Sequence, residues 1–548
     1  MARMDGSPTL TGLKLPAPMP TYPFILHSAV EINNNREGRF TVIAGMECAM
    51  FPDRVCARDF AGFHLAAREY AHPNVTLEQN TQDKPTFSIT INGNTLDPST
   101  LAAVDSIETN YILVQTRTLL GPSDRQKLGD VGVQQPDYSL PQHIYLGKGQ
   151  VIAVADTGLD QGEHKPLHSA FTGRMIRWFG NNTADYTGHG THVCGSAVGD
   201  FSNAVNGRVT GAAPEASLIF QGIWEPEVPA PGATKVEGKL KPPADLIELF
   251  EPLYKEGARV HSNSWGRISR IGTSRALMQL GYTDRARKID TFVWDNPEMV
   301  IRFSAGNQGK YAFVGQGKGH IGSQAAAKNC ITVGASKKSP DPNIIADSSS
   351  LGPVMGGRPK PDVQLVLQVR NEMATPLVAG CAAVLRESLV NRSPPPTAAL
   401  IKALLINGAD ILGPVNKNPL PENVNKAGFG RVNMANALAV VRGEAGTGFE
   451  EPSVDDKTLL WEKKITVDQA KATLKVTLVW SDPPGDMIKN QLRLEVKDAD
   501  GPKFTPSNNV VQQVVIEEVA TGAVTLKVGV IGGVLDKSPQ KFAISWRV

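Results

Sequence analysis

Three short stretches of the 548-residue sequence place reactive side chains beside small residues. VIAVADTGLD carries Asp156, GHGTHVCGSAVG carries His189 and His192, and VIRFSAGNQG carries Asn307. Asp156 and Asn307 each come just after an apolar run, and functional groups gather at the carboxyl ends of strands in a parallel sheet. A carboxylate can orient an imidazole that acts as a general base, and an amide can donate to a developing oxyanion. The three stretches therefore favour a site for acid–base chemistry.

Each stretch also has an ordinary structural interpretation. An Asp after a strand is often a helix cap or a turn residue, and an Asn in a Gly-rich turn is common. His189 and His192, three residues apart, could suggest a metal site, but no third His lies nearby in sequence. An isolated His is more often structural, yet its place after the Asp156 stretch favours a shared chemical role.

Residues 145–445 have the pattern of elements that could position these groups. A segment with Leu249, Phe250 and Leu253 on one helical face ends at Gly257, as a helix should. Short apolar runs alternate with such helical patterns, which predicts an α/β fold with a parallel sheet flanked by helices. The runs are Val151–Ala155, Ser217–Ile223, Arg259–Trp265, Val300–Ala305 and Cys330–Ala335.

The two flanking regions differ from this pattern. We expect residues 1–140 to form an N-terminal α+β region, with a hairpin signal at Asn92-Gly93 and a strand signal over Tyr111–Thr116. Residues 452–548 alternate apolar and polar side chains, which predicts a C-terminal antiparallel β-sandwich domain. Trp480 and Trp546 belong to the inward-facing set of that alternation.

Together these stretches resemble the subtilisin-like serine proteases (subtilases, peptidase S8) that carry a C-terminal β-sandwich. GAAPEASLIF, HSNSWG, AKNCITVGAS, SSSLGP with GGRPKPDV, MATPLVAG and AGFGRVN follow in family order from about residue 145 to 440. The resemblance implies a serine endopeptidase in which Asp156 orients and stabilises His189, His189 is the general base and acid, and Asn307 helps form the oxyanion hole. It also implies a substrate channel lined by Ser264, Trp265, Gly266, Ser304, Ala305 and Gly306, and a prosegment-like role for residues 1–140.

The sequence departs from the family where the nucleophile should lie. Subtilases have Gly-Thr-Ser before Met-Ala-Thr-Pro, whereas this chain has Arg370-Asn371-Glu372, so Glu372 stands in place of the Ser. Only the nine residues Gln364–Glu372 separate Val363 from Met373. We expect this interval to lack the strand and the substrate-contacting loop that the family builds here.

Three interpretations follow from the departure. The written sequence can skip the Ser-containing segment of an active subtilase, for example through a mistaken exon boundary. The chain can be a pseudoprotease that binds peptides in its cleft without cutting them. Alternatively, the β-sandwich can be the functional part, as a binding module on an inert scaffold, which exposed aromatic residues on one of its faces would favour.

Composition limits the partners and the cofactors. With 56 Lys and Arg against 54 Asp and Glu, the net charge of +2 gives no case for nucleic acid or a charged membrane surface. No apolar run is long enough to span a membrane, and no secretory signal is visible. The five cysteines lack metal-ligand spacing, and we expect free thiols rather than a Cys48–Cys56 bridge. We expect a monomer with a protein or peptide substrate and no cofactor.

Calcium is frequent in the family, so the acidic segment Asp498–Gly501 needs an interpretation. Its residues Asp498-Ala499-Asp500-Gly501 are typical of a hairpin turn, and the spacing is not a clear calcium motif. We therefore expect a turn here.

Overall fold

The computed structural model describes most of residues 145–548 and four short strands before them. The gaps lie at 181–182, 204–206, 228–237, 268, 271–276, 279–280, 310–320, 338–342, 367–373, 413–420 and 506–507. The early strands are β1 (Val30–Glu31), β2 (Thr41–Ile43), β3 (Val75–Gln79) and β4 (Thr86–Ile91), in the order β1-β2-β4-β3. Asn92-Gly93, Tyr111–Thr116, Cys48, Cys56 and Arg370–Glu372 lie outside the described residues.

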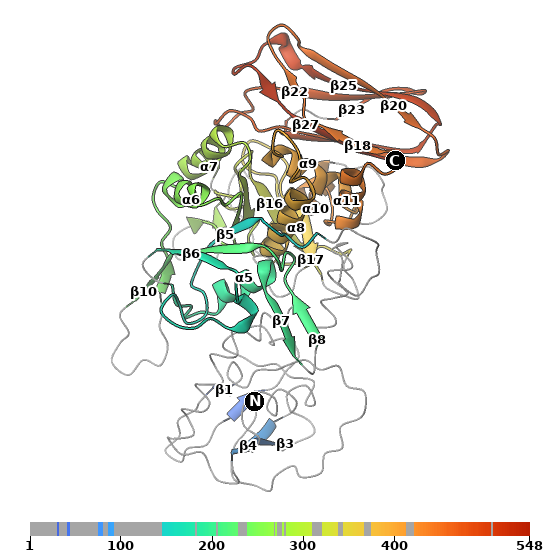
Figure 1. Cartoon of the computed structure of the whole chain (residues 1–548). Helices are drawn as coiled ribbons and strands as arrows, with labels where there is room; N and C mark the ends of the chain where they lie inside the picture. The colour runs from blue at the N-terminus through green and yellow to red at the C-terminus, as the bar shows by residue number, and fades with distance from the viewer. Residues whose placement is uncertain are drawn as a thin grey trace.

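A seven-stranded parallel sheet forms the centre of the molecule (Figure 1). Its order is β17-β16-β15-β12-β5-β9-β6, and every neighbouring pair is parallel. The strands are β5 (Val151–Asp156), β6 (Met175–Phe179), β9 (Ser217–Gly222), β12 (Val260–Asn263), β15 (Val300–Ser304), β16 (Ile331–Ser336) and β17 (Val363–Val366). The five apolar runs correspond to β5, β9, β12, β15 and β16, so the predicted α/β class with a parallel sheet is confirmed.

The edge strand β17 corrects one expectation. We expected the interval after Val363 to lack a strand, but Val363–Val366 pairs with β16 in parallel register. The backbone of Gln364 also bonds on its other side, donating to Gly430 O and accepting from Val432 N, at 2.8 and 3.0 Å. Four residues are enough because the downstream segment around residues 430–432 satisfies the outer edge, which a reading of the interval alone does not reveal.

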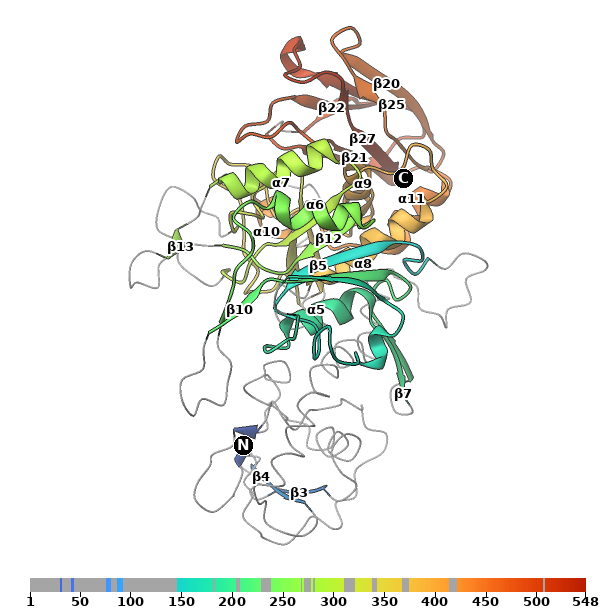
Figure 2. The same ribbon diagram turned by 60° about the vertical axis from the view of Figure 1, so that its left-hand side comes forward.

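Helices cover both faces of this sheet (Figures 1 and 2). Phe250 of α6 packs on His261 of β12, whereas Arg302 of β15 faces α8 and donates to Val378 O, at 3.2 Å. The helices α6 and α7 therefore lie on one face, while α8 lies on the other with α5 packed against it. The helices are α5 (His189–Val198), α6 (Ile247–Lys255), α7 (Asp284–Asp295), α8 (Ala374–Ser388), α9 (Ala398–Gly408), α10 (Pro421–Ala427) and α11 (Met434–Arg442).

The segment predicted as a helix is α6, and its burial explains the prediction. Leu249, Phe250 and Leu253 are fully buried, and Gly257 follows the helix with a left-handed φ of 93°. Three two-stranded hairpins extend from the α/β core: β7 (Asp200–Asn203) with β8 (Gly207–Thr210), β10 (Trp224–Pro226) with β11 (Gly238–Leu240), and β13 (Ser269–Arg270) with β14 (Leu277–Met278).

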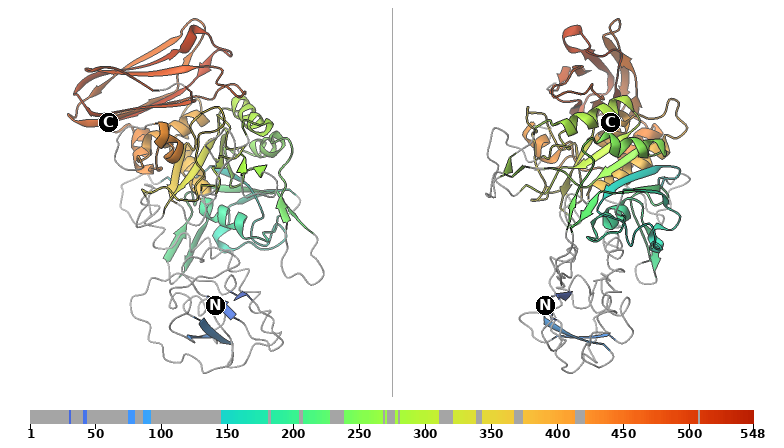
Figure 3. Two further views of the ribbon diagram at one scale, coloured as in Figure 1. Left: turned by 180° about the vertical axis from the view of Figure 1, so that it is seen from behind. Right: turned by 90° about the vertical axis from the view of Figure 1, so that its left-hand side faces the viewer.

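Two four-stranded antiparallel sheets follow the α/β core (Figure 3). One is β18 (Thr447–Glu450), β27 (Ala543–Arg547), β21 (Ala472–Val479) and β24 (Val511–Val519), in that order. The other is β20 (Leu460–Val467), β25 (Gly522–Val530), β22 (Leu492–Asp498) and β23 (Gly501–Phe504). The short strands β19 (Ser453–Val454) and β26 (Gln540–Lys541) pair separately. Asp498 pairs with Gly501 across a two-residue turn, as predicted.

Strand β21 is buried on both faces, unlike the expected alternation. Lys475 and Thr477, the polar members of its pattern, are 4% and 0% exposed. The cause is α9, which packs on the face of β21 that faces away from the second sheet. Fully buried Asn407 of α9 donates to Lys475 O at 3.0 Å and to Ser545 O at 3.2 Å. The C-terminal sheets and the α/β core therefore share one buried interface.

Other buried features agree with the sequence. Trp480 and Trp546 are 1% and 7% exposed, as expected of core residues. Cys194, Cys330 and Cys381 are free and buried. Within the described residues, no helix combines the length and the apolar character that crossing a membrane requires.

Candidate functional site

The side chains of Asp156 and His189 meet where β5 ends and α5 begins. His189 Nδ1 lies 2.6 Å from Asp156 Oδ1. The Asp156 carboxylate is fully buried, whereas the imidazole is 25% exposed. Because a carboxylate accepts, Nδ1 carries a proton, and in the neutral imidazole Nε2 is then the unprotonated ring nitrogen. The expected contact is present, and it gives His189 the tautomer that a general base requires.

Glycines allow α5 to approach β5 this closely. A Cβ on Gly190 would lie 2.1 Å from the carbonyl oxygen of Gly158, a distance that no side chain tolerates. Gly188, directly before the helix, has a left-handed φ of 76°. The glycines in GHGTH are therefore required by the contact between the helix and the strand end.

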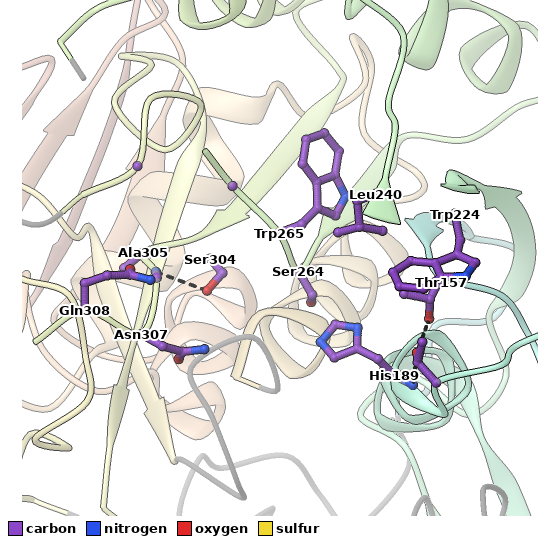
Figure 4. A pocket seen from close by; sticks show the side chains of 14 residues that line it. Thr157, His189, Trp224, Leu240, Ser264, Trp265, Ser304, Ala305, Asn307 and Gln308 are labelled. Atoms are coloured by element: carbon purple, nitrogen blue, oxygen red, sulfur yellow. Dashed lines mark hydrogen bonds between the residues drawn. The ribbon is translucent and has the colours of Figure 1, made fainter. Parts of the chain in front are cut away.

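A pocket of about 400 Å³ opens beside this pair (Figure 4). In the view of Figure 4, His189 and Ser264 lie in the middle, Asn307 and Gln308 on one side, and Trp224 and Thr157 on the other. All seven residues predicted for the oxyanion hole and the substrate channel line it: Ser264, Trp265, Gly266, Ser304, Ala305, Gly306 and Asn307. Thus, the structure brings together residues of α5 and residues at the ends of β5, β12 and β15, and two of them, Thr157 and Asn307, are 150 positions apart in the sequence.

The wall formed by Trp265 is fixed by contacts on two sides. Its indole Nε1 donates to Ala155 O at 2.9 Å, and its ring meets Phe303 edge to face, with centroids 5.3 Å apart. The side chain is 7% exposed. A buried aromatic with its polar atom satisfied is rigid, so Trp265 shapes the pocket without rearranging.

The turn that carries Asn307 is held by hydrogen bonds and by one glycine. Gly306 N donates to Ser304 Oγ at 3.3 Å, and Gln308 N donates to Ser350 Oγ at 3.0 Å. Gly306 has a φ of 108°, a conformation that favours glycine. The turn therefore fixes the backbone on both sides of Asn307, whose amide borders the pocket.

The hairpin β10–β11, which also lines the pocket, was not expected from the sequence. Trp224 and Leu240 are paired across this hairpin, and both line the pocket. The short strands have no periodic signal, and the hairpin partners Glu225 and Lys239 lie 14 positions apart in the sequence. Only the alternation of Trp224 and Pro226 around a charged Glu225 could have suggested a strand here.

Of two other sequence candidates, His192 lies apart from this site and Glu372 lies outside the described residues. His192 is buried within α5, where burial holds its pKa well below the usual value, and it is not part of the pocket lining. In the described part of the chain, no three His, Cys, Asp or Glu side chains converge as metal ligands would. Glu372 lies outside the described residues, and α8 begins two residues later at Ala374.

Comparison with known proteins places this geometry in a family context. The model of the subtilase family, peptidase S8, matches residues 147–365. The serine protease/ABC transporter B family protein tagD of Dictyostelium discoideum is 35% identical over 250 residues, which is 42% of this chain and 12% of that protein. The serine protease AprX of Bacillus subtilis (strain 168) is 27% identical over 329 residues, which is 53% of this chain and 66% of that protein.

The chain spans about an eighth of the length of the first relatives, with 12% coverage of both tagD and tagB of Dictyostelium discoideum. Among solved structures, the prenylagaramide maturation protease PagA is 20% identical, with a TM-score of 0.38 over 58% of this chain and 99% of that chain.

Proposed function

The chain is related to the subtilase family, whose model matches residues 147–365, and on this premise we propose that the pocket is the substrate cleft of a serine-type endopeptidase. One observation carries the proposal: the hydrogen bond of 2.6 Å between Asp156 and His189, at the edge of a pocket that Asn307 also borders. A subtilase acts on proteins or peptides, so the substrate class is a polypeptide.

The roles follow from the chemistry of each group. Asp156 holds the proton of His189 on Nδ1 and stabilises the imidazolium that forms when Nε2 takes a proton from the nucleophile. The same nitrogen then returns the proton to the leaving amine. The amide of Asn307 donates to the oxyanion of the tetrahedral intermediate, a contribution of about 10²–10³ in rate for one donor. Residues 264–266 and 304–306 flank the peptide.

The chain as written lacks a nucleophile for this reaction. Glu372 occupies the sequence position of the Ser. A carboxylate has no hydroxyl proton for His189 to remove, and its acyl product would be a labile mixed anhydride. We therefore propose that serine endopeptidase is the activity of the intact domain and that this exact chain does not hydrolyse peptide bonds.

The second candidate is a pseudoprotease that binds peptides without cutting them. It is favoured by the pocket, which is lined by all seven expected residues although the sequence lacks the Ser. The third interpretation, a binding module in the C-terminal sheets, has less support because Trp480 and Trp546 are buried rather than displayed.

A repaired chain tests the proposal. The interval between Val363 and Met373 is replaced by a subtilase segment that ends in Gly-Thr-Ser, and His189→Ala in the repaired chain is the matched control. Labelling by a fluorophosphonate probe and cleavage of casein are measured for all forms. We expect the repaired chain to react in both assays and the His189→Ala control and the chain as written to react in neither.

Two results would contradict these expectations. Probe labelling of the chain as written that His189→Ala abolishes would show an active nucleophile and refute the inactivity. A repaired chain that folds and binds peptide but does not react would favour the pseudoprotease. The genomic sequence between the codons of Val363 and Met373 distinguishes a skipped segment from a true loss, since an open frame encoding Gly-Thr-Ser supports the former.

A further inference from the structure

Asp185 lies in the loop before α5 and collects an unusual number of donors. Its Oδ1 accepts from the Thr157 hydroxyl at 2.9 Å, from Thr187 N and hydroxyl at 3.1 Å each, and from Gly188 N at 2.9 Å. Its Oδ2 accepts from Thr191 N at 2.8 Å and from the Thr191 hydroxyl at 2.7 Å. The residue is 6% exposed. Six donor groups thus lie within hydrogen-bond distance of this buried carboxylate, and one of them, the Thr187 hydroxyl, shares its single proton between Asp185 and Thr157 Oγ1.

These bonds satisfy the free N–H groups at the start of α5. The first N–H groups of a helix have no partner within the helix. Here Gly188 N and Thr191 N donate to Asp185, while His189 N donates to Thr187 Oγ1 at 3.1 Å and Gly190 N to Thr157 Oγ1 at 2.9 Å. The carboxylate also suits the positive end of the helix dipole. The first turn of α5, which carries His189, is therefore held from outside the helix.

Thr157 extends this set of hydrogen bonds to the strand that carries Asp156. Its backbone N donates to Asp156 Oδ1 at 2.7 Å, the oxygen that also contacts His189 Nδ1. Its hydroxyl donates to Asp185 and accepts from Gly190 N. Asp185 is thus connected to both members of the Asp156–His189 pair through one intervening residue on each side.

We propose that Asp185 is the positioning residue that holds the end of β5 and the first turn of α5 together, so that Asp156 and His189 stay in contact. Asp185 does not line the pocket, and its effect passes through Thr157 and the backbone of α5. The inference rests on the roles proposed above for Asp156 and His189. Its test measures their contact and not proteolysis, so the two proposals can fail separately.

The chemistry requires a carboxylate at this position. All six groups that surround Asp185 can donate, and three of them are backbone N–H groups that cannot do otherwise. An Asn side chain would place its NH₂ group against N–H donors on one side, because only one of its two terminal atoms accepts. Asp185→Asn therefore preserves the shape of the side chain but removes one of the two acceptor atoms that bind the surrounding donors.

The proton on His189 Nδ1 reports the contact directly. A proton in a hydrogen bond between an imidazole and a carboxylate is strongly deshielded and exchanges slowly, so it gives a distinct low-field resonance. Full-length protein labelled with ¹⁵N-histidine is recorded, and His189→Ala assigns the signal by its loss. We expect the signal in the wild type and its loss in Asp185→Asn.

Three further variants separate positioning from general stability. Thr157→Val removes the hydroxyl that connects to Asp185, and we expect the signal to be lost, whereas Thr157→Ser retains the hydroxyl and the signal. Asp160→Asn is the matched control, because Asp160 is also buried beside α5 but its side chain accepts from His168 N. We expect Asp160→Asn to keep the signal even if it lowers the melting temperature.

Two outcomes would overturn the inference. One is a signal in folded Asp185→Asn at the wild-type chemical shift. The other is equal loss of the signal in Asp160→Asn, which would indicate a general loosening of this region. If Asp185→Asn does not fold, the comparison of Thr157→Val with Thr157→Ser decides, and an unchanged signal in Thr157→Val refutes the proposal.

Discussion

A buried ion pair between the α/β core and the C-terminal sheets gives the strongest stability prediction. The Nζ of Lys328 donates to Asp482 Oδ2 at 2.5 Å, to Pro483 O at 2.8 Å and to Met487 O at 2.9 Å. Both charged side chains are 0% exposed. Lys328→Met leaves the Asp482 carboxylate buried without its cation, and breaking such a pair from one side costs about 3–5 kcal/mol. That is a large part of a total stability of about 5–15 kcal/mol.

Equilibrium unfolding in urea, followed by tryptophan fluorescence and far-UV circular dichroism, measures this loss. Adding Asp482→Asn to the Lys328→Met variant removes the unpaired charge, and we expect the double variant to recover at least half of the lost stability. Lys241→Met is the exposed control, since the Lys241 and Glu225 side chains are 66% and 45% exposed. We expect that control to unfold at the wild-type urea concentration.

The stability loss of Lys328→Met should also depend on pH, in a direction that the pKa of Asp482 determines. Burial raises the pKa of Asp482, and Lys328 opposes that effect. Removing Lys328 raises the pKa of Asp482 in the folded state further. As pH rises above about 4, Asp482 therefore loses its proton in the unfolded state before it does so in the folded state. The deficit of Lys328→Met should therefore be smaller at pH 5 than at pH 8. A deficit below about 1 kcal/mol at pH 8, or no recovery in the double variant, would refute the reasoning.

Four further predictions concern other parts of the chain. Burial lowers the pKa of Lys475 to about 8, so the unfolded state binds more protons than the folded state from about pH 8 to 10.4. Over that range the free energy of unfolding of the wild type, measured in urea, should rise by about 3 kcal/mol relative to that of Lys475→Met. Gly190→Ala should cost about 1–3 kcal/mol or more in the same assay, because its Cβ would overlap Gly158 O. Glu372→Ser alone should cleave casein at least about 10²-fold more slowly than the repaired chain, because misplacement of a nucleophile by about 1 Å has that effect on the rate. We expect the misplacement because Arg370 remains where the family has Gly. A rate near that of the repaired chain would contradict this. Three buried thiols with raised pKa values should stay unmodified when the native protein is treated with iodoacetamide and analysed by mass spectrometry: Cys194, Cys330 and Cys381. Their rapid modification would contradict their burial.

Local patterns in the sequence were sufficient for the buried strands and for α6. The runs that became β5, β9, β15 and β16 are largely apolar, and the structure buries them and the more polar β12 on both faces. An interior strand of a parallel sheet can be recognised from its own residues, because a strand buried on both faces is rich in apolar side chains. Edge strands are different. β6 is partly exposed, with Arg177 facing solvent, and β17 is completed by residues 430–432, so neither had a signal of its own.

The candidate site divides in the same way. Asp156, His189 and Asn307 could be identified from the sequence because each lies in a short motif of glycines and small residues that its backbone geometry requires. The substitution at Glu372 is likewise a fact of the sequence alone. Trp224 and Leu240 could not be identified, since a short hairpin that lines a pocket has no periodicity to reveal it.

The sequence by itself determined the α/β class, the antiparallel C-terminal region and the residues that could do chemistry, because burial and backbone conformation leave marks within a few neighbouring positions. Only the tertiary structure decided which distant groups meet. Asp185 accepts from Thr157, 28 positions away, and Lys328 pairs with Asp482, 154 positions away. Such bonds depend on the three-dimensional placement of both partners. The local sequence around either partner contains no pattern that identifies the other.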